Sequence, residues 1–114
     1  MKAQVFRGVD RLSYEELPVP DIAPDEVLVQ VQVVGLCQSD IKKIRYPLYE
    51  PPRIFGHETA GVIAAVGDRV TDWQVGQRVV VMHHIPCMRC RYCLNDNFSM
   101  CDVYKNISTT AGFV

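Results

Sequence analysis

The sequence lacks both a long apolar segment and an excess of either charge. Its most apolar stretch, residues 60–67, is far shorter than the roughly 20 residues that a membrane-spanning helix needs. Twelve basic and thirteen acidic side chains leave a net charge of −1 over 114 residues. Proteins that bind nucleic acid or acidic membranes through bulk charge carry a positive excess. We therefore expect neither nucleic-acid binding nor membrane binding.

The beginning of the sequence lacks the apolar core of a signal peptide. Arg7, Asp10 and Arg11 all lie within the first eleven residues, where a signal peptide needs an uninterrupted apolar stretch. We expect a cytoplasmic protein. A chain of 114 residues is long enough for one compact domain and too short for two, so we assign residues 1–114 to a single domain.

Helical periodicity is scarce, whereas short strand patterns are frequent. Two short segments, 3–6 and 12–15, are separated by turn residues and predict a hairpin. Valines occupy alternate positions along 26–34, which predicts the most secure strand. Further strands are predicted over 58–66 and 78–82, the latter buried, with Trp73 in the core. The pattern indicates a mainly β protein.

One short helix interrupts the strands. Ser39 or Asp40 is expected to cap it, and Pro47 stops it. Its basic side chains are expected to form a solvated face: Lys42, Lys43 and Arg45. Strands and helices do not alternate, and no G-x-G-x-x-G sequence occurs. A dinucleotide-binding Rossmann domain is therefore not expected within this chain.

Four of the five cysteines fall in one irregular segment, residues 83–104. Their spacing is Cys87-x2-Cys90-x2-Cys93-x7-Cys101. Four thiolates can enclose a tetrahedral zinc ion with no open position, which is the pattern of a structural site. The segment has too little apolar content to order itself, so a metal is a plausible source of its stability. We predict a structural-zinc lobe over about residues 83–104.

Other interpretations of the quartet remain open at this point. A ferredoxin-type iron–sulfur run would have a fourth gap of three residues followed by proline, whereas here the gap is seven and Asp102 follows. Disulfides or unrelated thiols are a second alternative. A nucleic-acid-binding zinc ribbon is a third, although Asp96 and Asp102 offset the nearby basic residues. His83 and His84 could also supply ligands.

Cys37, His57 and Glu58 form a second set of residues that zinc accepts as ligands. Each is weak evidence alone, because a lone cysteine usually acts as a small apolar residue and a lone histidine is usually structural. Their surroundings carry more information. Cys37 lies in Gly35-Leu36-Cys37-Gln38-Ser39-Asp40, directly after a predicted strand, and the sequence Gly56-His57-Glu58 opens the next one.

These motifs resemble the N-terminal part of the zinc-dependent medium-chain alcohol dehydrogenases, the family of the sorbitol and threonine dehydrogenases. The family's G-[IL]-C-x-S-D sequence matches residues 35–40, and the quartet matches its four-cysteine lobe. Its zinc signature G-H-E-x2-G-x5-G-x2-V matches at Gly56, His57, Glu58, Gly61, Gly67 and Val70.

The resemblance implies a partly open, GroES-like β-barrel with a short helix and a zinc lobe. It implies that Cys37 and His57 are catalytic zinc ligands and that Glu58 is a ligand or lies just beyond the metal. Ser39 then holds the substrate hydroxyl and passes its proton on, and Asp40 orients the ligating imidazole. The quartet becomes the structural zinc site.

The implied activity is oxidation of a small alcohol or polyol with NAD or NADP, and a homo-oligomer is compatible with the family. We expect this chain to be a fragment of such an enzyme, inactive alone, because the third family ligand of the catalytic zinc and the nicotinamide site are not among its residues. Lys42 occupies the position of a proton-relay histidine. The alternative is a non-enzymatic zinc-stabilised barrel that binds a partner or acts as a thiol switch.

Overall fold

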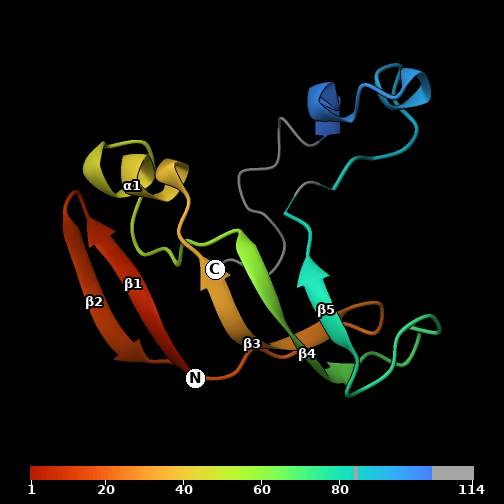
Figure 1. The fold of residues 1–114 in the computed structure, drawn as a ribbon, viewed down its shortest axis with the longest axis horizontal. Helices are drawn as coiled ribbons and strands as arrows, with labels where there is room; N and C mark the ends of the chain where they lie inside the picture. Colours follow the sequence, from red (N-terminus) through yellow and green to blue (C-terminus); the bar gives the residue numbers. More distant parts are fainter. Residues whose placement is uncertain (84, 104–114) are drawn as a thin grey trace. The chain divides into compact units, whose positions relative to one another are not determined.

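A computed structural model describes residues 1–83 and 85–103, in a chain that divides into two compact units, Met1–Val81 and Met82–Val114. Figure 1 shows the course of the chain. The first unit contains β1 (Lys2–Gly8), β2 (Arg11–Glu16), β3 (Val27–Gly35), α1 (Gln38–Arg45), β4 (Glu58–Val66) and β5 (Arg78–Val81). The second contains two 3-10 turns, η1 (Cys93–Asn95) and η2 (Phe98–Met100). The predicted mainly β fold with a short helix is confirmed.

Strands β1 and β2 form the predicted antiparallel hairpin (Figure 1). Gly8, which ends β1, has φ 137°, and Asp10, in the turn that follows, has φ 54°. Glycine and aspartate tolerate these backbone conformations better than most residues. The Asp10 amide also donates to the Ile44 carbonyl of α1 at 2.9 Å. The hairpin turn is thereby attached to the helix that follows β3.

Strands β3, β4 and β5 form an antiparallel sheet with β4 in the centre. The predicted strands over 26–34 and 58–66 are confirmed. Two irregularities in the β3–β4 register bring Gly35, the last residue of β3, opposite Glu58, the first residue of β4. Residues that follow β3 therefore lie next to residues that precede β4.

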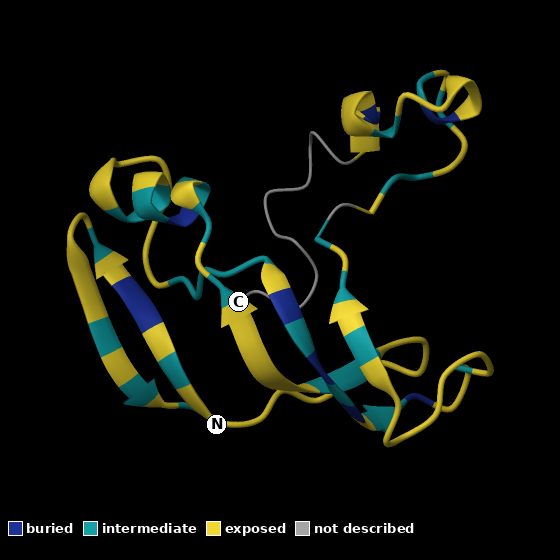
Figure 2. Ribbon diagram, viewed as in Figure 1, coloured by how far each residue is buried: buried dark blue, intermediate teal, exposed yellow. Residues whose placement is uncertain are grey.

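The apolar core of the first unit is small and centred on Phe6. Phe6 and Ile63 are each only 1% exposed. Figure 2 shows in dark blue that β1 and β4 contain buried segments. The ring of Phe6 contacts Phe55 at a centroid distance of 5.2 Å, and Phe6 forms an isolated β-bridge with Arg53. The segment before β4 is thus packed against the hairpin, which fixes where β4 begins.

The predicted burial of β5 and Trp73 was wrong. Val80 is 80% exposed and Trp73 is 49% exposed, and β5 is an edge strand of its sheet (Figure 2). A run of apolar residues predicts a strand, but the burial of that strand depends on whether a second layer of structure covers it. Within the described residues of the first unit, nothing covers Val80.

In the two described ranges, no helix combines the length and apolar character needed to cross a membrane.

Candidate metal centres

Three ligand side chains meet at the end of the β3–β4 pair. Cys37 follows β3, His57 directly precedes β4, and Glu58 begins β4. One ligand atom from each lies within 4.8 Å of the other two. Zinc bonds of roughly 2.0–2.3 Å place tetrahedral ligand atoms roughly 3.3–3.8 Å apart. A thiolate, an imidazole and a carboxylate at this spacing therefore fit a single zinc ion after small side-chain adjustments.

Cys37 is also the N-cap residue of α1, with extended backbone angles of φ −82° and ψ 149°. The prediction that Ser39 or Asp40 caps the helix was wrong, because the helix already begins at Gln38. Asp40 instead occupies the third helical position, and its Oδ2 accepts a hydrogen bond from the Cys37 amide at 3.3 Å. This is the carboxylate half of a capping box. It fixes the backbone that carries the Cys37 thiol.

The other oxygen of Asp40 contacts the imidazole of His57. The distance from Asp40 Oδ1 to His57 Nδ1 is 3.2 Å, and Asp40 is only 2% exposed. A neutral imidazole that donates from Nδ1 carries its lone pair on Nε2, the atom then suited to a metal. One buried carboxylate thus holds both the Cys37 backbone and the His57 ring, as expected for a residue that orients metal ligands.

Glu58 occupies space that exists only because residue 35 is glycine. A Cβ atom built on Gly35 would overlap Oε2 of Glu58 and lie 2.9 Å from the Cβ of Glu58. The two residues are cross-strand partners in the β3–β4 ladder. Gly35 therefore makes room for the Glu58 side chain, and the sequence had suggested no such role for it. The signal for it was its place in the motif, two residues before Cys37.

Two further side chains from α1 reach this cluster. The Ser39 hydroxyl donates to Cys37 Sγ at 3.3 Å. Lys43 Nζ lies 3.3 Å from Asp40 Oδ1, and its side chain is 25% exposed. The predicted solvated face was therefore wrong for Lys43, whereas Lys42 and Arg45 are exposed as predicted. On a helix, residues three apart lie on the same side, which brings Lys43 next to Asp40.

The cysteine quartet forms the second cluster, in the second unit of the chain. Its four Sγ atoms all lie within 4.8 Å of one another, with Cys87–Cys93 at 4.0 Å and Cys90–Cys93 at 3.6 Å. Tetrahedral zinc with bonds of about 2.3 Å places sulfurs about 3.8 Å apart. The cysteines are free, so the disulfide alternative does not describe this structure. Sulfurs this close suit a single four-coordinate ion better than an iron–sulfur cluster, which needs space for several iron and sulfide atoms between the cysteines.

Backbone amides point at the sulfurs of this cluster. The Cys87 amide donates to Cys101 Sγ and the Cys90 amide to Cys87 Sγ, each at 3.3 Å. Backbone hydrogen bonds, first from Cys93 and then from Asp102, lower the pKa of Cys90 to about 6. Burial raises the pKa of Cys93 to about 12. A buried thiol of this kind becomes a thiolate when a cation supplies the compensating charge.

The remaining candidate ligands do not join either cluster. Among residues 1–83 and 85–103, the groups of ligand atoms close enough to hold an ion are the two described above, and neither includes His83. His84, the other histidine considered as a ligand, lies outside the described residues.

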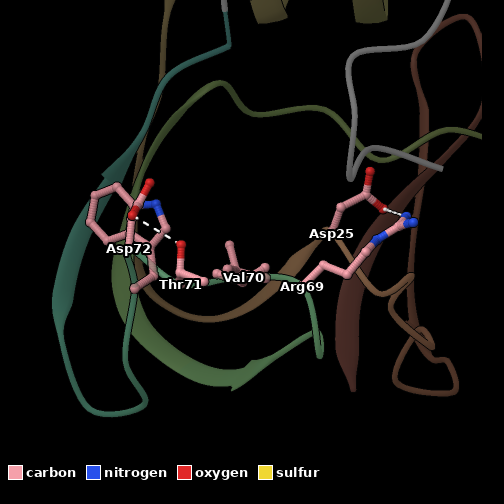
Figure 3. A pocket seen from close by; sticks show the side chains of 7 residues that line it. Asp25, Arg69, Val70, Thr71 and Asp72 are labelled. Carbon is pink, nitrogen blue, oxygen red and sulfur yellow. Dashed lines mark hydrogen bonds and ion pairs between the residues drawn. The ribbon is translucent and has the colours of Figure 1, made fainter.

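A surface hollow of about 290 Å³ lies elsewhere in the first unit (Figure 3). Trp73 lines it, as do Arg69 and Asp25, whose charged atoms are 3.5 Å apart and whose side chains are both 69% exposed. At the other side of the hollow, the Thr71 hydroxyl donates a hydrogen bond to Oδ1 of Asp72 (Figure 3). None of the predicted site residues lines this hollow, so we assign it no part in the chemistry.

Comparison with known proteins identifies the fold and the family. Residues 23–114 match the alcohol dehydrogenase GroES-like domain. Sorbitol dehydrogenase of Bacillus subtilis is 41% identical over 114 residues, which cover 96% of this chain and 32% of that protein. The structure matches galactitol-1-phosphate dehydrogenase from Escherichia coli with a TM-score of 0.84 and 30% identity, over 100% of this chain and 35% of that one.

A cobalt- and zinc-bound thermostable alcohol dehydrogenase from Pyrobaculum aerophilum also matches. Its TM-score is 0.82 with 32% identity, and the match covers 91% of this chain and 32% of that chain. The chain thus spans about a third of the length of the relatives it matches. The family match covers well over half of its residues. The chain therefore belongs to the family of alcohol dehydrogenase GroES-like domains.

Proposed function

We propose that this member of the alcohol dehydrogenase GroES-like domain family supplies the zinc-binding part of the active site of an NAD- or NADP-dependent alcohol or polyol dehydrogenase. The observation that carries the proposal is the convergence of Cys37, His57 and Glu58 within 4.8 Å. The names of the matched relatives support a polyol substrate, because sorbitol and galactitol 1-phosphate are both polyols.

In this proposal Cys37, His57 and Glu58 hold the zinc ion. When bound, zinc supplies a Lewis acid that lowers the pKa of the substrate hydroxyl. Glu58 is the exposed member of the three, while Cys37 and His57 are half-buried. The protein ligands approach from the backbone of β3 and β4, so the opposite side of the cluster is the side from which a substrate hydroxyl would enter.

The hydroxyl of Ser39 is the proposed acceptor of the substrate proton. It lies 3.3 Å from Cys37 Sγ and is half-buried, so it is next to the ligand that would neighbour a bound alcohol. A serine hydroxyl both donates and accepts hydrogen bonds. Rotation about its Cα–Cβ bond would turn it from the cysteine sulfur to the substrate oxygen, which it would hold while the proton passes on.

Asp40 is the proposed positioning residue of the site. Its two oxygens contact the Cys37 amide and His57 Nδ1, and it is almost completely buried. A carboxylate in this position keeps Nε2 available for the metal and limits rotation of the ring. Substrate orientation depends on the metal position, so Asp40 acts on the reaction through the two ligands.

The cysteine quartet is proposed to hold a structural zinc. Cys87, Cys90, Cys93 and Cys101 complete a tetrahedron, so no position remains for a substrate. The metal would stabilise the lobe, about residues 83–104, which we include in one catalytic domain over residues 1–114. A purely structural zinc module or a thiol switch would need this quartet but would have no use for the second cluster.

The hydride acceptor is proposed to be NAD or NADP. The sequence contains no G-x-G-x-x-G motif, so we predict that residues 1–114 by themselves do not oxidise an alcohol with either nucleotide. Turnover of any alcohol by this chain alone would contradict that prediction. The cytoplasmic location and a homo-oligomer remain predictions.

Substitution of Cys37 tests the proposed function directly. Cys37→Ser should remove one of two zinc ions from the chain and abolish alcohol turnover in the full-length dehydrogenase, because a neutral hydroxyl is a poor replacement for a thiolate ligand. Zinc content by atomic emission and turnover with sorbitol and NAD or NADP are the measurements. Ser99→Ala, an exposed position in η2, is the control. Unchanged zinc content and turnover in the Cys37 variant would contradict the proposal.

A further inference from the structure

We propose that Lys43 is a positioning residue for the metal cluster of the first unit, acting through Asp40. The inference rests on the proposed function, since it concerns the ion that Cys37, His57 and Glu58 would hold. The starting observation is that Lys43 Nζ lies 3.3 Å from Asp40 Oδ1, the same oxygen that contacts His57 Nδ1.

The charges around this cluster do not balance without Lys43. The ligand set contains a cysteine thiolate and the Glu58 carboxylate, and Asp40 adds a third negative charge directly behind His57. A divalent ion neutralises two of these three charges. Lys43 supplies the remaining positive charge, so the metal-loaded cluster is formally neutral. A buried charge that lacks a partner is costly, and Asp40 is 2% exposed.

The position of Lys43 is fixed from two sides. The ammonium lies 5.7 Å from the centroid of the Phe55 ring, within the range of a cation–π contact. Phe55 packs in turn against Phe6 in the core. The side chain is only 25% exposed, unlike that of a solvated lysine. The ammonium is thus held between an aromatic ring of the core and the carboxylate that orients His57.

The Asp40 carboxylate makes three polar contacts, and they involve both of its oxygens. Its Oδ2 accepts from the Cys37 amide at 3.3 Å, and its Oδ1 faces both His57 and Lys43. The imidazole and the ammonium contact the same oxygen, at 3.2 and 3.3 Å, so each of them limits rotation of the carboxylate. Without Lys43, the carboxylate would lose one of the two groups that hold Oδ1 and would be freer to turn away from His57.

The neighbouring lysine provides a matched control. Lys42 is on the same helix and carries the same charge, but it is exposed, and no contact between it and Asp40 is seen in the described residues. Removal of Lys42 therefore changes the net charge of the chain to the same extent without changing the surroundings of Asp40. Any general effect of charge on metal binding would be equal for the two variants.

The test is cobalt binding to the chain. Protein given one equivalent of Zn²⁺, which the four-thiolate cluster would take, is titrated with Co²⁺, whose d–d absorbance reports its ligand geometry. We expect Lys43→Met to weaken Co²⁺ binding about tenfold, the lower end of the range for groups that support metal ligands, and to alter the band shape. Lys42→Met should stay within about twofold of wild type, and Lys43→Arg should restore most of the affinity.

The possible results separate the two proposals. Wild-type protein that binds no Co²⁺ beyond the zinc-loaded quartet would overturn the proposed metal site, and the role of Lys43 with it. Wild-type binding with equal affinity and identical spectra in Lys43→Met and Lys42→Met would overturn only the role of Lys43. Circular dichroism of each variant checks folding, and Lys43→Gln replaces Lys43→Met if the latter does not fold.

Discussion

The two clusters of potential metal ligands differ in how the chain assembles them. The quartet comes from one segment of fifteen residues, Cys87 to Cys101, with four identical ligands and amides directed at the sulfurs. The other cluster combines three residue types from the ends of two paired strands. The first is a local structure whose proposed zinc ion would stabilise it. The second is produced by a sheet that already holds its residues in place.

This difference explains why the two clusters are suited to different roles. Four thiolates surround an ion completely, and short spacings let one loop provide them all. The mixed cluster offers three potential ligands, one of them exposed, and Asp40 contacts two of these residues without being among the three. Sites that bind a substrate typically have an open coordination position and further residues that orient the metal ligands.

The largest expected effect is loss of the quartet metal. Cys87→Ser should remove one zinc ion and unfold the lobe, because apparent zinc-binding free energies in small zinc modules are about 10–16 kcal/mol and contribute directly to folding. Hydrogen exchange should then become fast in the described part of the second unit, residues 85–103, while β1 to β5 stay protected. Ser99→Ala is the control within the lobe. Unchanged zinc content and exchange would show that the quartet is not a metal site.

A smaller effect is expected from substituting Gly35, the glycine that ends β3 opposite Glu58. Gly35→Ala should weaken metal binding in the mixed cluster about 10–100-fold, since a Cβ there displaces the Glu58 carboxylate. In a Glu58→Gly background, which removes the obstructing side chain, the same substitution should change metal affinity about twofold or less. Isothermal titration with Zn²⁺ gives both values. Equal losses in the two backgrounds would mean that Gly35 acts through the backbone and not through Glu58.

The smallest effect is expected in the hairpin, which takes part in neither cluster. Arg7 Nε donates to Glu15 at 2.8 Å, and this hydrogen bond lowers the pKa of Glu15. A lowered pKa contributes stability above the unfolded value of about 4.3 that is lost as the pH falls through the folded value. Arg7→Met should therefore be slightly less stable than wild type at pH 7.

The pH dependence of the stability difference between wild type and Arg7→Met tests this prediction. Urea unfolding midpoints of wild type and Arg7→Met should converge once the pH falls below the lowered folded pKa of Glu15, because the carboxyl is then protonated in both the folded and the unfolded state. Arg11→Met, which removes an arginine of the same hairpin that is exposed, should show no such convergence. A gap between wild type and Arg7→Met that persists in acid would assign the effect of Arg7 to packing of its aliphatic stem.

Sequence reasoning located the quartet better than it described the mixed cluster, and the cause is sequence separation. The four cysteines are local, so their spacing alone predicts their proximity. Cys37 and His57 are twenty positions apart in the sequence, and their proximity depends on the register that pairs Gly35 with Glu58. Only the resemblance to a family connected them in advance.

The features that the sequence did not reveal are those that depend on contacts across the fold. Lys43 reads as one of three solvated helix residues, and only the structure brings it to Asp40. The burial of β5 was overestimated because valines predict a strand without indicating what covers it. The helix cap was misplaced by two residues or more, because cysteine is not among the common capping residues.

The most direct test of this account is the metal content of the purified chain, measured by atomic emission together with its visible absorbance. Two zinc ions per chain and no visible band are predicted, with one ion lost in Cys37→Ser and the other in Cys87→Ser. Iron with a visible band, or a wild-type chain that holds no metal, would contradict both clusters as zinc sites. A single zinc that survives in Cys37→Ser would contradict the mixed cluster alone.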